Sequence, residues 1–313
     1  MTGPDTNLDL VTGAFSYSGA HIAQRLLETG RRVKTLTFHP DRRHPLEHRV
    51  QALPYRFDDP LALARALEGV TTFYNTYWVR FDHGSATFDA AVANSRALFR
   101  AARAAGVRRI VHLSIANPSA ASPLPYYRGK ALVERSLADV GVPFSIVRPT
   151  WIFGGEPEIL ANNIAWILRR MPLFAIPGDG RYPVQPVHVD DLAHICLGVA
   201  NADRDLIVDA AGPETFSFEQ LVRAVRSATE SRARILHVPP LVMAAAARAL
   251  GRVLGDVVLT RDEITGLIAG LLVSHDPPLG RIVFSDWLND HAGSIGQTYA
   301  SELERHFTPA GAG

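Results

Sequence analysis

The chain of 313 residues has a single cysteine, Cys196. One cysteine cannot form an internal disulfide, and it excludes a zinc site built from several thiolates. The sequence also lacks an excess of charge of one sign, because 32 basic residues stand against 31 acidic ones. Nucleic-acid-binding proteins need clustered basic residues, so no nucleic-acid partner is expected. The 12 histidines show no HExxH or similar ligand spacing, and no metal site is expected either.

Long hydrophobic runs are missing as well. The most apolar late stretches, Leu241–Leu250 and Ile264–Val273, are shorter than the roughly 20 residues that cross a bilayer. The segment Met1–Asp9 is polar and acidic, without the basic and apolar regions of a secretory signal. We therefore expect no membrane span and a cytoplasmic location. The small residues Ala244–Ala247 are expected to pack closely against a neighbour.

What is present is the composition of an ordinary globular protein, with 47% hydrophobic and 20% charged residues. The first half alternates short apolar runs with amphipathic stretches, the pattern of a parallel sheet covered by helices. The expected strands are Leu8–Thr12, Val33–Phe38, Val70–Thr76, Arg109–Ile115 and Phe144–Arg148. The expected helices are His21–Thr29, Leu61–Leu67, Thr87–Ala105 and Arg128–Val140. The pattern predicts an α/β fold, a doubly wound parallel sheet of the Rossmann type.

The second half has a different character. Proline and glycine punctuate residues 154–186, which is typical of loops and short helices. A helix capped by Asp190 or Asp191 is expected next, and Ser217 with Gln220 has the spacing of a capping box.

These differences predict two parts in the chain. We expect a dinucleotide-binding Rossmann domain over residues 1–150, completed by about residues 184–210. A smaller, discontinuous C-terminal substrate lobe is expected over residues 151–183 and 211–313. The length fits this arrangement better than two independent domains.

The turn after the first expected strand is the segment Thr12–Gly19, which reads Thr-Gly-Ala-Phe-Ser-Tyr-Ser-Gly. In dinucleotide-binding folds, a glycine-rich turn at this place brings backbone N–H groups and a helix N-terminus to a pyrophosphate. Gly13 would allow the tight turn and Gly19 the close packing of helix on strand, while Ser16 stands where a glycine is usual. Glycine is also common in ordinary βα turns, but the position after a strand and before a helix is the one the fingerprint requires. The turn therefore predicts a dinucleotide site.

The end of the second strand bears on which cofactor is bound. NAD-specific sites usually carry an acidic residue there for the ribose 2′-hydroxyl, and this sequence has none until Asp41. His39, Arg42 and Arg43 could instead meet a 2′-phosphate with charge-assisted hydrogen bonds, or they could form a solvated basic loop. We expect NADP, with NAD as the alternative.

Tyr126 and Lys130 are four residues apart and would share one face of a helix. An ammonium group near a phenol lowers the phenol's pKa from about 10, so Tyr126 could serve as general acid or base during hydride transfer. Lys130 could also hold the nicotinamide ribose. Tyr127 is a competing candidate, and the two tyrosines could instead cover the core.

For several other side chains the sequence is compatible with either a binding role or a structural one. Asn75 and Thr76 end a strand, where backbone could lie beside a cofactor. Tyr77, Trp78 and His83 could line a substrate pocket or cap the sheet. His112 and His188 are expected to be structural. Arg100, Arg103, Arg108 and Arg109 are expected on a solvated surface, whereas Arg169, Arg170 and Arg181 could meet a nucleotide diphosphate or be surface charge.

Together these motifs resemble the short-chain dehydrogenase/reductase superfamily. The residues that carry the resemblance are the turn Thr12–Gly19, Asn94, Ser114, Tyr126 and Lys130. The segments Val147–Thr150, Phe153–Gly155 and Pro186–Asp191 are similar to its extended and atypical branch. That branch includes nucleotide-sugar epimerases and dehydratases, and the NAD(P)H-binding accessory subunit of respiratory complex I. The resemblance covers residues 8–230.

The resemblance implies a Rossmann fold, a nicotinamide cofactor and a catalytic site made of Ser114, Tyr126 and Lys130. The family often carries an acidic residue after the third strand that meets the adenine, and Asp58 is the candidate here. The cofactor-binding residues expected from motif and resemblance are Gly13, Phe15, Ser16, Tyr17, Gly19, Thr37, His39, Arg42, Asp58, Asn75, Thr76, Lys130, Pro149 and Ile152.

The separation of Ser114 from Tyr126 is short, with 11 residues between them, as in atypical members of the superfamily. The sequence therefore predicts an NAD(P)-binding oxidoreductase or epimerase-like enzyme that acts on a small molecule through a Tyr/Lys acid–base pair. The alternative is a non-catalytic NAD(P)H-binding redox sensor or assembly subunit. A homo-oligomer is compatible with either function.

Overall fold

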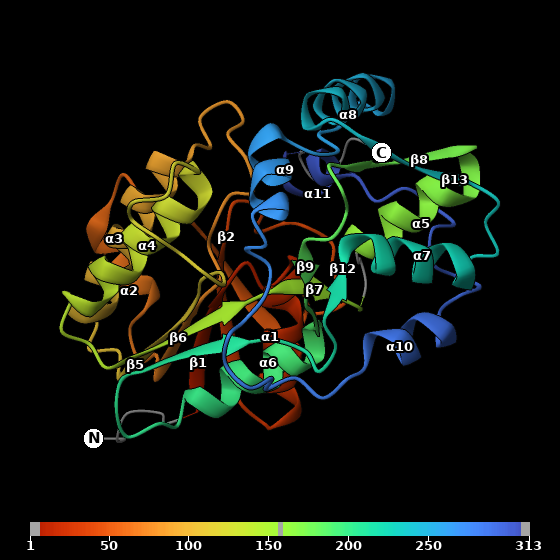
Figure 1. Cartoon of the computed structure of the whole chain (residues 1–313). Helices are drawn as coiled ribbons and strands as arrows, with labels where there is room; N and C mark the ends of the chain where they lie inside the picture. The colour runs from red at the N-terminus through yellow and green to blue at the C-terminus, as the bar shows by residue number, and fades with distance from the viewer. Residues whose placement is uncertain (1–6, 156–158, 308–313) are drawn as a thin grey trace. The chain divides into compact units, whose positions relative to one another are not determined.

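The computed structural model describes residues 7–155 and 159–307 (Figure 1). The chain divides into two compact units. Unit 1 takes in the chain up to Pro149 together with Leu192–Asp209. Unit 2 takes in Thr150–Asp191 and, among the described residues, 210–307.

Unit 1 is built on a seven-stranded sheet with the order β11-β6-β5-β4-β1-β2-β3. The strands are β1 (Leu8–Thr12), β2 (Arg32–Thr37), β3 (Val50–Pro54), β4 (Thr72–Asn75), β5 (Arg109–Leu113), β6 (Phe144–Pro149) and β11 (Leu206–Ala210). The registers from β3 through β6 are all parallel. The strand order reverses between β1 and β4, and ligands of such sheets bind at the carboxyl ends of the strands next to this reversal. The doubly wound parallel sheet predicted from the sequence is confirmed.

The helices of this half are α1 (Tyr17–Glu28), α2 (Pro60–Ala66), α3 (Phe88–Ala104), α4 (Pro125–Ala138) and α6 (Val189–Val199). Two of them begin at least three residues earlier than expected. α1 starts at Tyr17 rather than His21, and α4 starts at Pro125 rather than Arg128. A proline is well suited to the first helical position, because its missing N–H has no intrahelical partner there. Tyr126 therefore lies inside the helix and not in the loop before it.

The strand β3 (Val50–Pro54) had no bounds in the sequence pattern. It forms the edge of the sheet and pairs only with β2, in parallel register. Val50 is its only buried residue, so the strand lacks the alternation that marks a half-buried strand.

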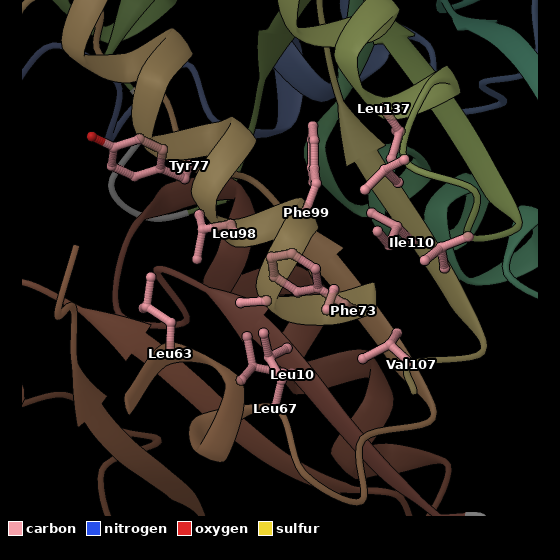
Figure 2. Packing of buried hydrophobic residues seen from close by; sticks show 14 of the residues in the cluster. Leu10, Leu63, Leu67, Phe73, Tyr77, Leu98, Phe99, Val107, Ile110 and Leu137 are labelled. Atoms are coloured by element: carbon pink, nitrogen blue, oxygen red, sulfur yellow. The ribbon is translucent and has the colours of Figure 1, made fainter. Parts of the chain in front are cut away.

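The core of unit 1 packs between the sheet and the helices α2, α3 and α4 (Figure 2). Leu10 of β1, Phe73 of β4 and Ile110 of β5 are fully buried, and Leu98 and Phe99 of α3 pack with them. Burying a side chain of this size stabilises the fold by about 1.5–3 kcal/mol. This packing fixes the strand ends that carry the candidate site.

Arg109 differs from the solvated position expected for it. The side chain is 8% exposed and donates hydrogen bonds to the carbonyl oxygens of Phe144 (2.8 Å), Ala202 (2.7 Å) and Arg204 (3.1 Å). The prediction was wrong for Arg109 because three backbone carbonyl groups, one in β6 and two between α6 and β11, accept the hydrogen bonds that water would otherwise accept. Arg100, Arg103 and Arg108 are exposed, as expected.

The only cysteine of the sequence, Cys196, lies on α6 and is 1% exposed. Burial raises the pKa of its thiol to about 12. The thiol is therefore protonated and shielded from solvent at neutral pH.

Unit 2 combines short strand pairs with helices. Its strands are β7 (Trp151–Phe153), β8 (Leu173–Pro177), β9 (Pro183–Val184), β10 (Pro186–His188), β12 (Phe216–Ser217) and β13 (Arg234–Val238). Its helices are α5 (Leu160–Arg170), α7 (Phe218–Ala228), α8 (Pro240–Leu254), α9 (Arg261–Ile268), α10 (Phe284–Asp290) and α11 (Glu302–Phe307). The strands pair as β10-β7, β12-β9 and β13-β8. A separate apolar cluster that includes Phe153, Leu221 and Phe284 forms the core of this unit.

Two expected caps have different outcomes. The capping box of Ser217 and Gln220 is confirmed, since both reciprocal hydrogen bonds are present at the start of α7. The cap expected from Asp190 or Asp191 is wrong, because α6 already begins at Val189. Asp191 lies in the first turn, where its Oδ2 accepts hydrogen bonds from the backbone N–H groups of Arg281 and Ile282, each at 2.7 Å.

Arg169 and Arg170 at the end of α5 are committed to backbone carbonyl groups of unit 2. Arg169 Nε donates to Ile295 O at 2.9 Å, and Arg170 Nη1 donates to Gly296 O at 2.8 Å. These contacts favour the structural reading of the two side chains over a nucleotide diphosphate site.

In the part of the chain that the structure describes, no helix is both long and apolar enough to cross a bilayer.

Candidate functional site

The turn between β1 and α1 has the conformation that its glycines permit. Gly13 has φ of +64°, and its N–H donates to Leu36 O at 2.9 Å. Ala14 N–H donates to Thr35 Oγ1 at 3.0 Å, so both bonds fix the turn to β2. A Cβ at Gly19 would lie 2.2 Å from Gly13 O. Only a residue without a Cβ lets α1 begin this close to the turn.

Ser16 takes the place of the usual middle glycine by closing the turn with its own side chain. Its hydroxyl donates to Gly13 O at 2.6 Å, and its backbone N–H donates to the same oxygen at 2.9 Å. Ser16 is also the N-cap residue of α1, yet its side chain accepts no capping hydrogen bond. A helix N-terminus whose cap side chain is turned away suits an anionic group.

The loop after β2 lies against this turn. The ring of Phe15 is 5.2 Å from the ring of His44. Burial and then the positive charge of Arg42 lower the pKa of His44, so Arg42 is near the same place. Thr37 Oγ1 accepts a hydrogen bond from His39 N–H at 3.1 Å, and Arg42 N–H donates to His39 O at 3.2 Å. The structure thus brings together Phe15 of the turn and the basic segment that follows β2.

Aromatic side chains cover the ends of β2, β3 and β4, a feature that the sequence analysis missed. Phe38 is 4.6 Å from Tyr55, Tyr55 stacks on Phe57 at 4.9 Å, and Phe57 is 5.5 Å from Tyr77. Phe38 is 60% exposed although it is a large apolar residue. The available signal was an aromatic residue one or two positions after the end of each of these strands, Phe38 after β2, Tyr55 after β3 and Tyr77 after β4.

Asp58, the expected adenine contact, follows β3 and is exposed. Its carboxylate accepts a hydrogen bond from Arg56 Nε at 3.3 Å, and this bond lowers the pKa of Asp58. The neighbouring Asp59 accepts from Ala62 N–H at 3.0 Å and caps α2. Of the two carboxylates, Asp58 is the one not used by a helix.

Thr12 joins the end of β1 to the end of β4. Its hydroxyl accepts hydrogen bonds from the N–H groups of Thr76 (2.7 Å) and Tyr77 (3.1 Å). In the other direction, Thr76 Oγ1 donates to Thr12 O at 2.5 Å. Thr12 was not among the predicted site residues, although it directly precedes Gly13. Asn75 is fully buried, and its amide nitrogen lies 3.1 Å from His112 Nδ1.

Buried polar atoms without partners gather near β4 and β5. Among the described residues, four buried side-chain atoms have no hydrogen-bond partner: Trp78 Nε1, Ser95 Oγ, His112 Nε2 and Ser114 Oγ. The expectation that His112 is a fully satisfied core residue was therefore half right, since only Nδ1 has a partner. Burial, and then the charge of Lys130, hold the pKa of His112 well below its ordinary value. Such groups are rare in native proteins and need an explanation.

Lys130 is almost completely enclosed in unit 1. It is 2% exposed, and its Nζ donates to Leu113 O at 2.8 Å. This oxygen belongs to the peptide that links Leu113 to Ser114. Burial lowers the pKa of Lys130 to about 7, while the carboxylate of Glu134 opposes the shift. Glu134 itself pairs with Arg148 at 2.6 Å. The ammonium group of Lys130 therefore loses its proton near neutral pH, unlike that of an ordinary lysine.

Tyr126 and Lys130 share one neighbour, the indole of Trp78. Lys130 Nζ is 4.7 Å from the centroid of the Trp78 ring, and the Tyr126 ring meets the same indole edge-on at 5.8 Å. A Cβ at Gly129 would lie 2.8 Å from Trp78, so this glycine gives the indole its place against α4. Tyr126 is half-buried, whereas Tyr127 is only 8% exposed.

The remaining predicted residues lie in separate places. Asn94 Nδ2 donates to Tyr77 Oη at 2.9 Å, which anchors the end of β4 to α3. Pro149 ends β6, and its carbonyl oxygen accepts from Ala116 N–H at 2.8 Å. Ile152 lies in β7 of unit 2 and is not part of unit 1.

His188 of unit 2 packs edge-on against Phe153 at 5.1 Å, which agrees with a structural role. Within residues 7–155 and 159–307, no group of three or more His, Cys, Asp or Glu side chains could hold a metal ion.

Comparison with known proteins gives a consistent picture. Residues 13–163 match the model of the NAD(P)H-binding family. The mitochondrial NADH dehydrogenase (ubiquinone) 1 alpha subcomplex subunit 9 of Mus musculus is 36% identical over 125 residues, 39% of this chain and 31% of the mouse protein. The matched part is thus about a third of that relative's length. Because this relative is mitochondrial by name, the cytoplasmic location expected from the sequence stays a prediction.

Two solved structures show the fold. Triphenylmethane reductase of Citrobacter sp., complexed with NADP(H), has a TM-score of 0.74 at 14% identity and covers 91% of this chain and 99% of its own. MoeE5 in complex with UDP-glucose and NAD has a TM-score of 0.64 at 20% identity and covers 84% of this chain and 98% of its own. Residues 13–163 therefore form an NAD(P)H-binding domain, the fold is Rossmann-like, and the expected resemblance to the complex I accessory subunit is confirmed by the mouse relative.

Proposed function

We propose that the chain is an NADP(H)-dependent oxidoreductase whose reacting groups are Tyr126, Lys130 and Ser114. Two neighbouring features carry the proposal. The buried Lys130 donates a hydrogen bond to the carbonyl oxygen of Leu113, the residue before Ser114. The hydroxyl of Ser114 is itself buried and has no hydrogen-bond partner. A buried hydroxyl that lacks a partner costs about 1–3 kcal/mol. This cost is offset if a ligand oxygen accepts or donates the missing hydrogen bond.

The residues of unit 1 fit a dinucleotide. The close approach at Gly19 and the open cap of α1 suit a pyrophosphate, and the ends of β2 and β4 offer backbone beside it. The residues of unit 1 that would hold the cofactor are Gly13, Phe15, Ser16, Tyr17, Gly19, Thr37, His39, Arg42, Asp58, Asn75, Thr76, Lys130 and Pro149. The cofactor, when bound, supplies or accepts the hydride.

The protein side chains would handle the proton. Tyr126 donates its phenolic proton to a substrate carbonyl oxygen during reduction and takes it back during oxidation. The Lys130 ammonium stabilises the phenolate, and the Ser114 hydroxyl orients the substrate oxygen. Since the reaction moves one proton and one hydride, no further reactant is needed.

A Tyr126→Phe variant tests this assignment. Turnover should fall by about 10²–10⁴-fold, while affinity for NADPH stays within a factor of two or so. Tyr127→Phe is the matched control, because Tyr127 is the neighbouring candidate and should keep full turnover. If Tyr126→Phe retains full turnover, the tyrosine has no part in the reaction.

The preference for NADP is proposed from the basic segment after β2. Arg42 is half-buried and near His44, which contacts Phe15 of the glycine turn, whereas Arg43 is exposed. Arg42→Ala should weaken NADPH binding by roughly 10- to 100-fold, the value of one charge-assisted hydrogen bond, and leave NADH binding unchanged. Arg43→Ala is the control and should change neither affinity. Equal losses for both cofactors in Arg42→Ala would contradict a 2′-phosphate contact.

A second candidate is an NAD(P)H-binding subunit without turnover. Lys130 is already engaged by Leu113 O and by the face of Trp78, and the mouse relative is by name a subunit of NADH dehydrogenase. The two functions differ in one measurement, the absorbance of bound NADPH during addition of quinone and carbonyl compounds. Oxidation that depends on Tyr126 supports the enzyme, and a cofactor that binds but is oxidised by no compound supports the subunit.

A further inference from the structure

Helix α8 (Pro240–Leu254) of unit 2 is apolar, yet most of it faces solvent. Only Ala247 and Gly251 are buried. Leu241 is 67% exposed, Val242 51% and Val253 83%. The small residues of this helix were expected to pack against a neighbour, and the structure shows that only one narrow stripe does so.

The buried stripe explains how α8 is held. A Cβ at Gly251 would lie 2.5 Å from Asp256 O, so the helix approaches its own exit segment closely. α8 also contacts β8 and α9 of the same unit, as Figure 1 shows. Because residues on one helical face recur every three or four positions, the face opposite Ala247 and Gly251 is the one that carries Val242, Ala246, Ala249 and Val253. The four residues of that outward face are uncharged, and the exposed Arg248 and Arg252 lie beside it on the helix.

The charge along this region has a single sign. Residues 231–255 contain four arginines, Arg232, Arg234, Arg248 and Arg252, and no aspartate or glutamate. Two of the four, Arg248 and Arg252, lie on α8 and are exposed. In a chain with balanced charge overall, this segment is locally basic as well as apolar.

The paired strands β8 and β13 of the same unit carry further exposed apolar residues, and β8 contacts α8. Leu173 of β8 is 50% exposed and lies opposite Arg234 of β13, and Leu236 is 44% exposed. A groove of about 880 Å³ beside them is lined by Met171 and Leu173, by Arg232 and Arg234 with two further arginines, and by one acidic residue, Glu230. Six of the ten exposed large apolar residues in the described chain belong to α8, β8, β13 and Met171. We call this set, with its four arginines, the α8 surface.

We propose that the α8 surface binds an anionic lipid bilayer, with α8 lying in the interface plane. An exposed apolar helix face flanked by arginines is the pattern of an interfacial helix. A second copy of the chain is a poorer occupant, since a twofold contact would bring the same four arginines together. The mode is attachment to one leaflet, which agrees with the absence of a spanning helix among the described residues.

Vesicle binding of the full chain tests the proposal. The protein should bind vesicles of phosphatidylcholine mixed with phosphatidylglycerol, and bind phosphatidylcholine alone at least tenfold more weakly. Each arginine near an anionic surface contributes about fivefold to affinity, so Arg248→Gln with Arg252→Gln should lower it by about 25-fold. High salt should weaken the binding as well.

Substitutions on the apolar face make the test specific. Leu241→Asp and Val253→Asp should abolish vesicle binding while the circular dichroism spectrum and NADPH affinity remain those of the parent. Leu61→Asp on α2 is the matched control, because Leu61 is 71% exposed and lies in unit 1. Unchanged vesicle binding in Val253→Asp, or no preference for anionic vesicles, overturns the proposal. If the parent protein does not bind vesicles but forms a dimer, and Val253→Asp makes that dimer dissociate, the surface binds a second copy of the chain instead.

Discussion

At the carboxyl ends of the strands in unit 1, the polar groups near β1 and β2 differ from those near β4 and β5 in how they are hydrogen-bonded. Around β1 and β2, the polar groups of the turn are hydrogen-bonded within the turn, as between Ser16 and Gly13, or to β2, as between Ala14 and Thr35. Around β4 and β5, Trp78, His112 and Ser114 each keep a buried atom without a partner. The turn after β1 is therefore held by hydrogen bonds within the protein, whereas the region after β4 and β5 has buried polar atoms that a ligand could bond.

This difference separates binding from chemistry. A turn whose backbone is already fixed can receive a phosphate-bearing ligand without rearrangement, which lowers the entropic cost of binding. Unpartnered donors and acceptors are costly in the free protein and become favourable only when a ligand meets them. We therefore expect substitutions in the turn after β1 to lower both the free energy of unfolding and the affinity for the cofactor. Substitutions near β4 and β5 should lower turnover without lowering the free energy of unfolding.

The largest effect should come from Gly19→Ala. The added Cβ would lie 2.2 Å from a backbone oxygen, so α1 must shift. Overpacking of this kind costs about 1–3 kcal/mol of unfolding free energy, and NADPH affinity should fall by more than tenfold. Gly198→Ala on α6 is the control, since nothing lies within 4 Å of its added Cβ and the change should be neutral or slightly stabilising. Urea unfolding and NADPH fluorescence titration measure both effects, and an unchanged affinity in Gly19→Ala would contradict the role of the turn.

The next effect concerns the titration of Lys130. The sequence has only two lysines, Lys34 and Lys130, so an NMR titration of labelled lysine resolves each, and Lys34→Arg assigns them. Lys130 should titrate at about 7, and Lys34, whose pKa burial also lowers, supplies the second lysine resonance. A Lys130 resonance that titrates near the ordinary value of about 10.4 would contradict the enclosed site.

The same shift sets a pH dependence of stability. Because the folded-state pKa of Lys130 lies below its unfolded value, the unfolded chain binds more protons between the two values. The free energy of unfolding should then rise with pH above about 7, by about 1.4 kcal/mol per pH unit from this group. The cost of burying the ammonium is complete below pH 7 and fades above it. Lys130→Met should remove this component, which urea unfolding at neutral and alkaline pH measures.

The smallest effect should distinguish two buried serines, Ser114 directly after β5 and Ser145 in the neighbouring strand β6. Ser114→Ala removes a hydroxyl without a partner and should leave the protein equally stable or more stable by about 1 kcal/mol. Ser145→Ala removes a hydroxyl that donates to Val199 O at 2.8 Å and should cost about 1–2 kcal/mol. Thermal unfolding compares the two variants. A loss of turnover in Ser114→Ala without a loss of stability would sharpen the separation of chemistry from folding.

Periodicity was sufficient to predict the sheet of unit 1, because its strands are apolar runs bounded by glycine turns. It failed for β3, whose edge position leaves only Val50 buried. It also failed for Arg109, since the carbonyl groups that receive its hydrogen bonds come from segments distant in sequence. Local spacing carries no information on such long-range partners.

The candidate site was predictable to a similar extent. The spacing of Tyr126 and Lys130 placed both on one face of α4, and the structure brings both to one ring. That this ring is Trp78, and that Gly129 makes room for it, depends on how α4 packs on the end of β4. The hydroxyl of Ser16 closing its own turn was likewise not predictable, because it depends on a side-chain rotamer.

The buried position of Cys196 gives the protein a clean background for site-specific labelling. With its thiol protonated and 1% exposed, it should resist maleimide and methanethiosulfonate reagents at neutral pH. A cysteine introduced at an exposed position, such as Val253→Cys on α8, would then be the only thiol to react. A spin label or fluorophore at that place would report the depth and polarity of its surroundings without any need to remove the natural cysteine.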